Sequence, residues 1–120
     1  MRASPKRLPA LLLLALLAAA GCAGRDPVPD PASPGARAAL QARSQTLIEA
    51  GNALYRAGDH TAAAKRYAAA TVVKPDDPAA YFGLGMALTK LGRDDEARQA
   101  YARARELAQQ ARGAGADSAR

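Results

Sequence analysis

The apolar and polar positions after residue 33 recur with the period of a helix, and no segment alternates with the period of two that strands show. Leu40, Leu47 and Leu54 fall on one stripe with Ile48 beside them, which predicts a single amphipathic helix. Three further helical segments follow along the chain. The sequence therefore predicts an all-α domain of about four helices.

Prolines, glycines and short polar residues mark where these helices begin and end. Ser33 and Pro34 suit a helix start, because serine caps free amides and proline fits the first helical position. Gly58 suits a helix end, and Asp59 suits the start of the next helix. We expect helices over residues 34–57, over 60–73, from 78 to near 92, and from about 94 past 107.

The helical region repeats itself at a spacing of 34 residues. Four pairs carry this signal, namely Gly51 with Gly85, Leu54 with Leu88, Gly58 with Gly92 and Tyr67 with Tyr101. Four alanine pairs match as well, but they add less because the chain is rich in alanine. Two helix–turn–helix units of equal length, over residues 44–77 and 78–111, are therefore predicted.

A helix–turn–helix unit of 34 residues resembles the tetratricopeptide repeat. This resemblance implies a short helical solenoid, whereas an unrelated alanine-rich bundle is the alternative. In each unit we expect a first-helix glycine to meet an alanine of the second helix, Gly51 opposite Ala63 and Gly85 opposite Ala97. The matched tyrosines are expected to fill the space between adjacent units.

The second unit carries polar residues where a third unit would have to stack. Its residues 105–107 read Arg-Glu-Leu, whereas the matching residues 71–73 of the first unit read Thr-Val-Val. Gln109 also replaces the closing Pro75. Because a terminal repeat must show water a polar face, we expect the array to end here.

The chain begins with a basic segment and a short apolar run. Arg2, Lys6 and Arg7 precede a run over residues 8–21, which is shorter than the roughly 20 residues of a membrane-spanning helix. This arrangement is typical of a secretory signal peptide. The alternatives are a buried N-terminal helix and a short membrane anchor.

The end of this run, Ala19-Ala20-Gly21-Cys22, resembles the lipobox of bacterial lipoproteins. The resemblance implies that Cys22 is the lipid attachment site and that the signal is cut just before it. The sequence departs from the family at Ala19, where leucine is preferred, and ordinary cleavage after Ala20 is the alternative. Ala23 stands where aspartate favours the inner membrane, so the resemblance implies the outer membrane.

These features predict a linear organisation of the chain. The expected parts are a signal peptide over 1–21, lipidated Cys22 with a proline-rich linker over 22–33, a repeat domain over 34–112 with an N-terminal cap at 37–43, and a disordered tail over 113–120.

The net charge of the chain indicates little about its function once the predicted signal peptide is left out of the count. The chain has 17 lysines and arginines against 11 acids. Three of the basic residues lie before residue 8, which leaves 14 against the same 11 acids because the first acid is Asp26. The remaining basic residues are spread around the helices without an aromatic-lined patch. We therefore expect solvated helix faces and no nucleic-acid partner.

The sequence contains no recognisable catalytic or metal-binding constellation. His60 is the sole histidine and is expected to be solvated, while the one cysteine is assigned to the lipid. The acids at 76–77 and 94–96 are explained as helix caps that the helix dipole favours. We expect no enzymatic activity, no cofactor and no metal site.

The resemblance to tetratricopeptide repeats implies that protein segments bind in a groove lined by the first helices. The predicted groove residues are Gln45, Ile48, Asn52, Tyr55, Arg56, Phe82, Met86, Thr89 and Lys90. For Ile48 and Phe82, a role in the core is the alternative. A clamp for a terminal carboxylate is not expected, because Ile48 stands where such a clamp has lysine.

The hypothesis that follows is a membrane-anchored adaptor or assembly factor of the bacterial cell envelope, facing the periplasm from the outer membrane. Its partners would be other envelope proteins or peptide segments, and the lipid would hold it to the membrane. An accessory subunit of an envelope enzyme and a self-assembling structural lipoprotein are the alternatives. Two units are fewer than the three usually needed, so a homo-oligomer is also a candidate.

Overall fold

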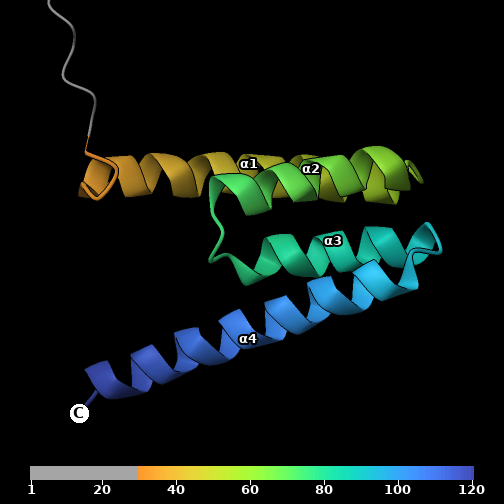
Figure 1. The fold of residues 1–120 in the computed structure, drawn as a ribbon. Coiled ribbons are helices and arrows are strands. Elements are labelled where there is room, and N and C mark those ends of the chain that lie inside the picture. Colours follow the sequence, from red (N-terminus) through yellow and green to blue (C-terminus); the bar gives the residue numbers. More distant parts are fainter. Residues whose placement is uncertain (1–29) are drawn as a thin grey trace, which may run out of the picture.

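The computed structural model describes residues 30–120. The predicted signal peptide, Cys22 and most of the proline-rich linker lie outside the described residues. The described part folds into four helices and contains no strand, as the sequence predicts (Figure 1). The helices are α1 (Pro34–Arg56), α2 (His60–Val73), α3 (Pro78–Lys90) and α4 (Asp94–Ser118).

Side-chain caps and left-handed glycines set the helix boundaries. The first three helices have side-chain caps, in which Ser33 accepts from the Ala36 amide, Asp59 from Ala62 and Asp77 from Ala79. The fourth helix lacks such a cap but places three acids in its first turn, where the helix dipole favours negative charge. Gly58 and Gly92 follow α1 and α3 with φ of 85° and 73°, which side-chain-bearing residues rarely adopt.

The four helices form two stacked hairpins (Figure 1). Within each hairpin the connection is short, so α1 lies antiparallel to α2 and α3 lies antiparallel to α4. The hairpins meet mainly through α2 and α3, and α1 contacts α3 over a smaller area. Within the described residues, α4 packs on α3 alone. This arrangement confirms the predicted tetratricopeptide-type solenoid.

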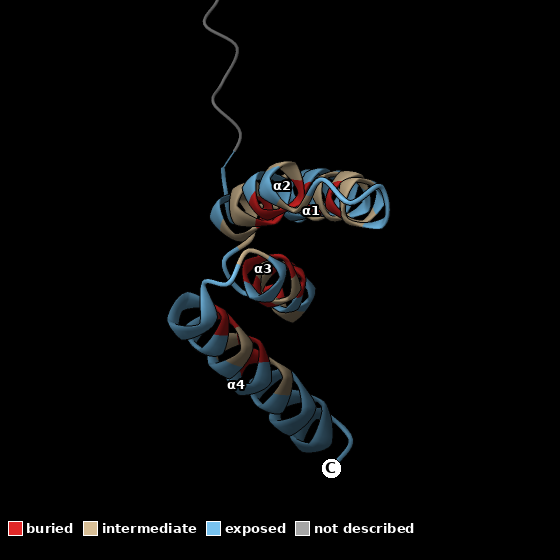
Figure 2. Ribbon diagram, turned by 90° about the vertical axis from the view of Figure 1, so that its right-hand side faces the viewer, coloured by how far each residue is buried: buried red, intermediate tan, exposed pale blue. Residues whose placement is uncertain are grey.

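Small residues and one tyrosine dominate the interior. The first core cluster contains Ala63, Ala64, Tyr67 and Ala87, and the second contains Leu88, Ala97 and Ala100. Buried positions gather where the helices face one another, whereas the outer end of α4 is exposed (Figure 2). Because alanine buries little apolar area, the van der Waals contacts of the interior come from the close approach of the helices rather than from large side chains.

The closest approach between helices occurs at glycines that face tyrosine rings. A Cβ atom built on Gly51 would lie 2.8 Å from Tyr67 Cε1, and one built on Gly85 would lie 2.8 Å from Tyr101 Cδ1. The expectation that these glycines meet Ala63 and Ala97 is therefore wrong. The aromatic rings are the largest side chains of the second helices, so they occupy the space that the glycines leave.

Tyr67 fills the space between the two units, as the sequence predicts. Its ring contacts Gly51 of its own unit, and a Cβ atom on Gly83 of the next unit would overlap the ring. The side chain is only 1% exposed. Tyr101, its counterpart, has Gly85 as a neighbour and is half-buried.

The predicted disorder of residues 113–120 is wrong, because α4 continues to Ser118. No proline interrupts the chain after Leu107, and Gly113 and Gly115 keep negative φ values. Every residue from 109 to 120 is exposed. At the other end, the predicted cap over residues 37–43 forms early turns of α1 and is exposed except at Gln41.

Candidate functional site

The predicted groove residues divide into an exposed set and a half-buried set. The exposed set contains Gln45, Arg56, Phe82, Thr89 and Lys90, and the half-buried set contains Ile48, Asn52, Tyr55 and Met86. All nine belong to α1 or α3, the first helices of the two units. The structure thus leaves mostly polar members of the predicted surface open to solvent.

Three of the half-buried residues take part in packing within the domain. The Tyr67 hydroxyl donates a hydrogen bond to Asn52 Oδ1 at 2.6 Å, while Ile48 and Tyr55 pack against the cluster around Tyr67. The ring of Tyr55 also lies 4.9 Å from that of His60, so His60 is half-buried rather than fully solvated as predicted. Burial raises the pKa of the Tyr67 phenol.

Arg56 and Lys90 occupy matching positions in the two units. Each lies in the last turn of its helix, α1 or α3, and each is exposed. A basic residue at this place also interacts favourably with the helix dipole. Because α1 contacts α3, the two cations belong to neighbouring helices.

Phe82 is the one predicted residue that lines a groove between α3 and α4. It is 53% exposed, and its ring centroid is 5.5 Å from that of Tyr101 in an edge-on arrangement. We call this hollow of about 1000 Å³ the end groove. It is lined by Pro78, Ala79, Phe82, Arg98, Tyr101, Ala102, Ala104, Arg105 and Ala108.

The end groove corrects the expectation of a polar terminal face. Arg105 lines it as predicted, but the surface between Arg105 and Arg98 consists of aromatic and alanine side chains. The repeat spacing indicates this surface, because Tyr101 matches Tyr67, which fills the space between the two units.

The ion pairs of α4 are local. Arg103 pairs with Glu106 at 2.8 Å, and Arg98 pairs with Asp95. The hydrogen bond that the Arg103 guanidinium donates to Glu106 raises the pKa of Arg103. These pairs join residues three positions apart on an exposed helix, so their contribution to stability is small. Arg105 has no ion-pair partner among the described residues.

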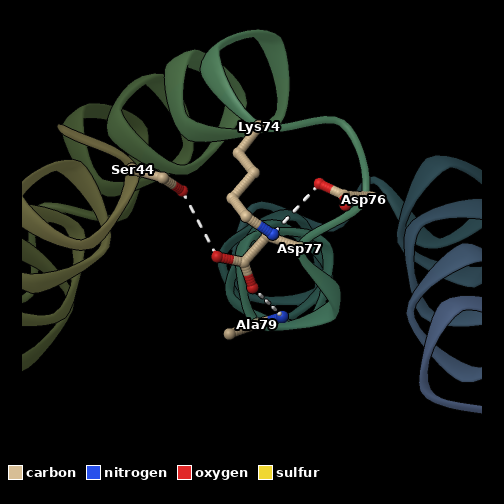
Figure 3. Close-up of polar contacts among 5 residues, drawn as sticks. All are labelled: Ser44, Lys74, Asp76, Asp77 and Ala79. Atoms are coloured by element: carbon tan, nitrogen blue, oxygen red, sulfur yellow. Dashed lines mark hydrogen bonds and ion pairs between the residues drawn. The ribbon is translucent and has the colours of Figure 1, made fainter. Parts of the chain in front are cut away.

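A polar cluster at the junction of the units is structural (Figure 3). Buried Ser44 donates a hydrogen bond to Asp77 Oδ2 at 3.3 Å, and Asp77 Oδ1 accepts from the Ala79 amide at 3.0 Å. Lys74 donates to Asp76 Oδ1 at 3.0 Å and thereby lowers the pKa of that carboxyl. Within residues 30–120, no group of three potential ligands is placed to hold a metal.

None of the described helices is both long enough and apolar enough to cross a membrane.

Comparison with known families gives one match over more than half of the chain. A family model described as tetratricopeptide repeat matches residues 48–117. The match begins within α1 and includes all of α2 and α3 and nearly all of α4. The comparison with curated proteins gave no match.

Proposed function

We propose that this chain, which belongs to the tetratricopeptide repeat family, is a lipid-anchored adaptor. It would bind other proteins at a bacterial envelope membrane. Repeats of this family are typically non-catalytic and mediate protein–protein interactions. The proposal adds a location and a binding face to this general role. The location rests on the N-terminal sequence, and the face rests on α1 and α3.

The matched pair Arg56 and Lys90 carries the assignment of the binding face. The two residues are separated by one repeat length and remain exposed on neighbouring first helices. Gln45 adds an exposed hydrogen-bonding group to α1. A partner segment with acidic and polar side chains, lying across α1 and α3, would satisfy these groups.

The N-terminal sequence supports a membrane location. A lipid on Cys22 would hold the chain at the surface, and Pro27, Pro29 and Pro31 favour an extended tether. A proline-rich segment of this length would hold the helical domain a few tens of ångströms, at roughly 3.1 Å per residue, from the lipid. That distance leaves α1 and α3 accessible to other envelope proteins.

The experiment is affinity capture from envelope membranes with the full chain as bait. The variant Arg56→Glu with Lys90→Glu reverses both cations of the proposed face. The matched control, Lys65→Glu with Arg66→Glu, reverses two exposed cations on α2. We expect the first variant to capture about tenfold less partner protein than the parent chain, or less still. The control should capture as much as the parent chain, and the two variants should have equal helicity.

Equal losses in the two variants would show that net charge, rather than this face, governs capture. Retention of partners by the Arg56 and Lys90 variant would place binding on another surface. Tyr55→Ala is a poor alternative test, because Tyr55 packs against the core cluster and its removal also destabilises the domain.

A further inference from the structure

The end groove corresponds to a surface that the chain itself covers in the first unit. There, α3 lies over the tyrosine of α2, and Gly83 provides the close contact with the Tyr67 ring. Tyr67 is 1% exposed as a result. Tyr101 is its counterpart one repeat later, but among the described glycines the only one that contacts it is Gly85 of its own unit. The structure therefore shows what kind of element covers this surface, namely a helix that presents glycine.

Within residues 30–120 no helix covers the end groove, because α4 continues in a straight line (Figure 1). In the first unit the helix ends at Val73 and turns back through residues 74–77 into α3. At the matching point after Leu107, α4 continues to Ser118 and leaves the body of the domain (Figure 1). We call residues 109–118 the overhang. Every one of them is exposed.

The overhang has the composition of a helix that approaches an aromatic ring closely. Residues 113–116 read Gly-Ala-Gly-Ala, and a Cβ atom added at either glycine would meet nothing within 4 Å. Each glycine costs about 1 kcal/mol relative to alanine in a helix interior. A free helical end with two glycines is therefore weakly stable, and packing against a partner would stabilise it.

The groove-facing stripe of α4 continues directly into the overhang. Tyr101 and Ala108 both line the end groove, and Gly115 follows at the same spacing of seven residues. Positions seven residues apart share one face of a helix. Tyr101 and Gly115 therefore lie on the same side of α4, at equal distances from Ala108.

We propose that the end groove binds a second copy of this chain. The two α4 helices pair antiparallel about a two-fold axis near Ala108, and each overhang lies in the end groove of the other copy. In this arrangement Gly115 of the partner subunit meets Tyr101 and supplies the glycine contact that Gly83 supplies to Tyr67. The interface is closed by symmetry, because each copy offers both a groove and an overhang.

The two surfaces that would meet are of matching kind. Each copy contributes the nine residues that line its end groove and the face of its overhang that carries Gly115. Arg112 borders the seam, where its long stem allows the guanidinium to reach water.

The test is sedimentation of the full chain in detergent over a wide range of concentration. We expect a dimer that dissociates on dilution. Phe82→Glu should weaken association by about tenfold or more, because a carboxylate would be buried in the groove. Val72→Glu is the matched control, since Val72 is an apolar residue of α2 that is 80% exposed. A chain truncated after residue 108 should be monomeric, with the helicity of residues 34–108 unchanged.

Cross-linking tests the antiparallel pairing of the two α4 helices independently. In a Cys22→Ser background, Ala108→Cys should form a disulfide-linked dimer on mild oxidation, whereas Gln99→Cys on the exposed side of α4 should not. A chain that stays monomeric at all concentrations would overturn the proposal. So would a dimer that survives the truncation, or a Phe82→Glu variant that loses a different captured protein while the parent chain is monomeric.

Discussion

Ser44 of α1 and Asp77, the N-cap of α3, join the two helix hairpins through one buried hydrogen bond. The Ser44 hydroxyl donates to Asp77 Oδ2 at 3.3 Å, and the two residues are 0% and 8% exposed (Figure 3). The second carboxylate oxygen of Asp77 caps α3 through the Ala79 amide. A single side chain therefore both caps α3 and fixes the position of this helix against α1.

Replacing Asp77 should destabilise the domain more than replacing Ser44. Asp77→Ala removes a helix cap, which costs about 0.5–2 kcal/mol, and leaves the buried Ser44 hydroxyl without an acceptor, which adds about 1–3 kcal/mol. Ser44→Ala removes the hydrogen bond but keeps the cap, at about 1 kcal/mol. Urea denaturation of both variants measures the difference.

Thr46→Ala is the control for this pair, because Thr46 is exposed and bonds only to the Ala42 carbonyl of its own helix. We expect no measurable loss for that variant. If Ser44→Ala proved as harmful as Asp77→Ala, the cap would contribute nothing and the hydrogen bond between the hairpins would account for the whole effect.

A methyl group at Gly83 should destabilise the domain although alanine is the better helix former. The added Cβ would overlap the ring of Tyr67, which Gly51 confines on another side. Overpacking of this kind costs about 1–3 kcal/mol, which exceeds the gain of about 1 kcal/mol in helix propensity. Thermal unfolding of Gly83→Ala should therefore show a lower melting temperature.

Gly85→Ala should cost less than Gly83→Ala, because Tyr101 borders the open end groove and its ring has room to move. Gly85→Leu is larger and should unfold the domain. Gly35→Ala is the control, since a Cβ there meets nothing within 4 Å. Equal losses at Gly83 and Gly85 would show that the two tyrosines are equally confined, contrary to the structure.

Alkaline unfolding should depend on Tyr67. Burial raises its pKa in the folded state above the ordinary value of about 10 for a phenol. The contribution of this group to stability is therefore complete below about pH 10 and is lost as the pH rises through the folded-state pKa. Tyr67→Phe should cost about 1 kcal/mol at neutral pH through the lost hydrogen bond to Asn52, and it should reduce the loss of stability above pH 10.

Asn52→Ala separates the two effects, because it removes the acceptor while the phenol stays buried. Denaturation curves at neutral and alkaline pH should show that this variant is less stable at both and keeps its alkaline sensitivity. If the sensitivity disappeared, the hydrogen bond rather than burial would control the ionisation of Tyr67.

The sequence predicts the periodic features of this fold and misses features that depend on contacts between helices. The spacing from Gly51 to Gly85 predicts the repeat, and Asp59 marks a helix start through local chemistry. The neighbour that the sequence predicts for Gly85 is wrong, because the repeat spacing shows which residues match but not which side chain fills the gap beside them. The predicted end of the last helix is wrong as well. Residues 113–116 are alanines and glycines, so whether they are helical depends on the turns next to them. The groove role of the nine residues on α1 and α3 stays a prediction.

Cys22→Ser should release the chain from the membrane. The resemblance of residues 19–22 to a lipobox implies that the cysteine sulfur takes a diacylglycerol and that the new N-terminus is acylated too. Since one acyl chain gives only marginal binding at about 0.8 kcal/mol per buried methylene, attachment depends on the complete modification. Serine has no thiol, so the variant should lack palmitate label, enter the aqueous phase on detergent partitioning, and remain uncut or miscut.

Ala23→Asp provides the matched control for that experiment. It keeps Cys22 and so should remain labelled and membrane-attached, but the resemblance implies that aspartate at this position retains a lipoprotein at the inner membrane. Separation of the two membranes by density should therefore show the parent chain in the outer fraction and Ala23→Asp in the inner one. If Cys22→Ser were instead cut after Ala20 and secreted like the parent chain, ordinary signal cleavage would hold. The adaptor would then need another means of reaching the membrane.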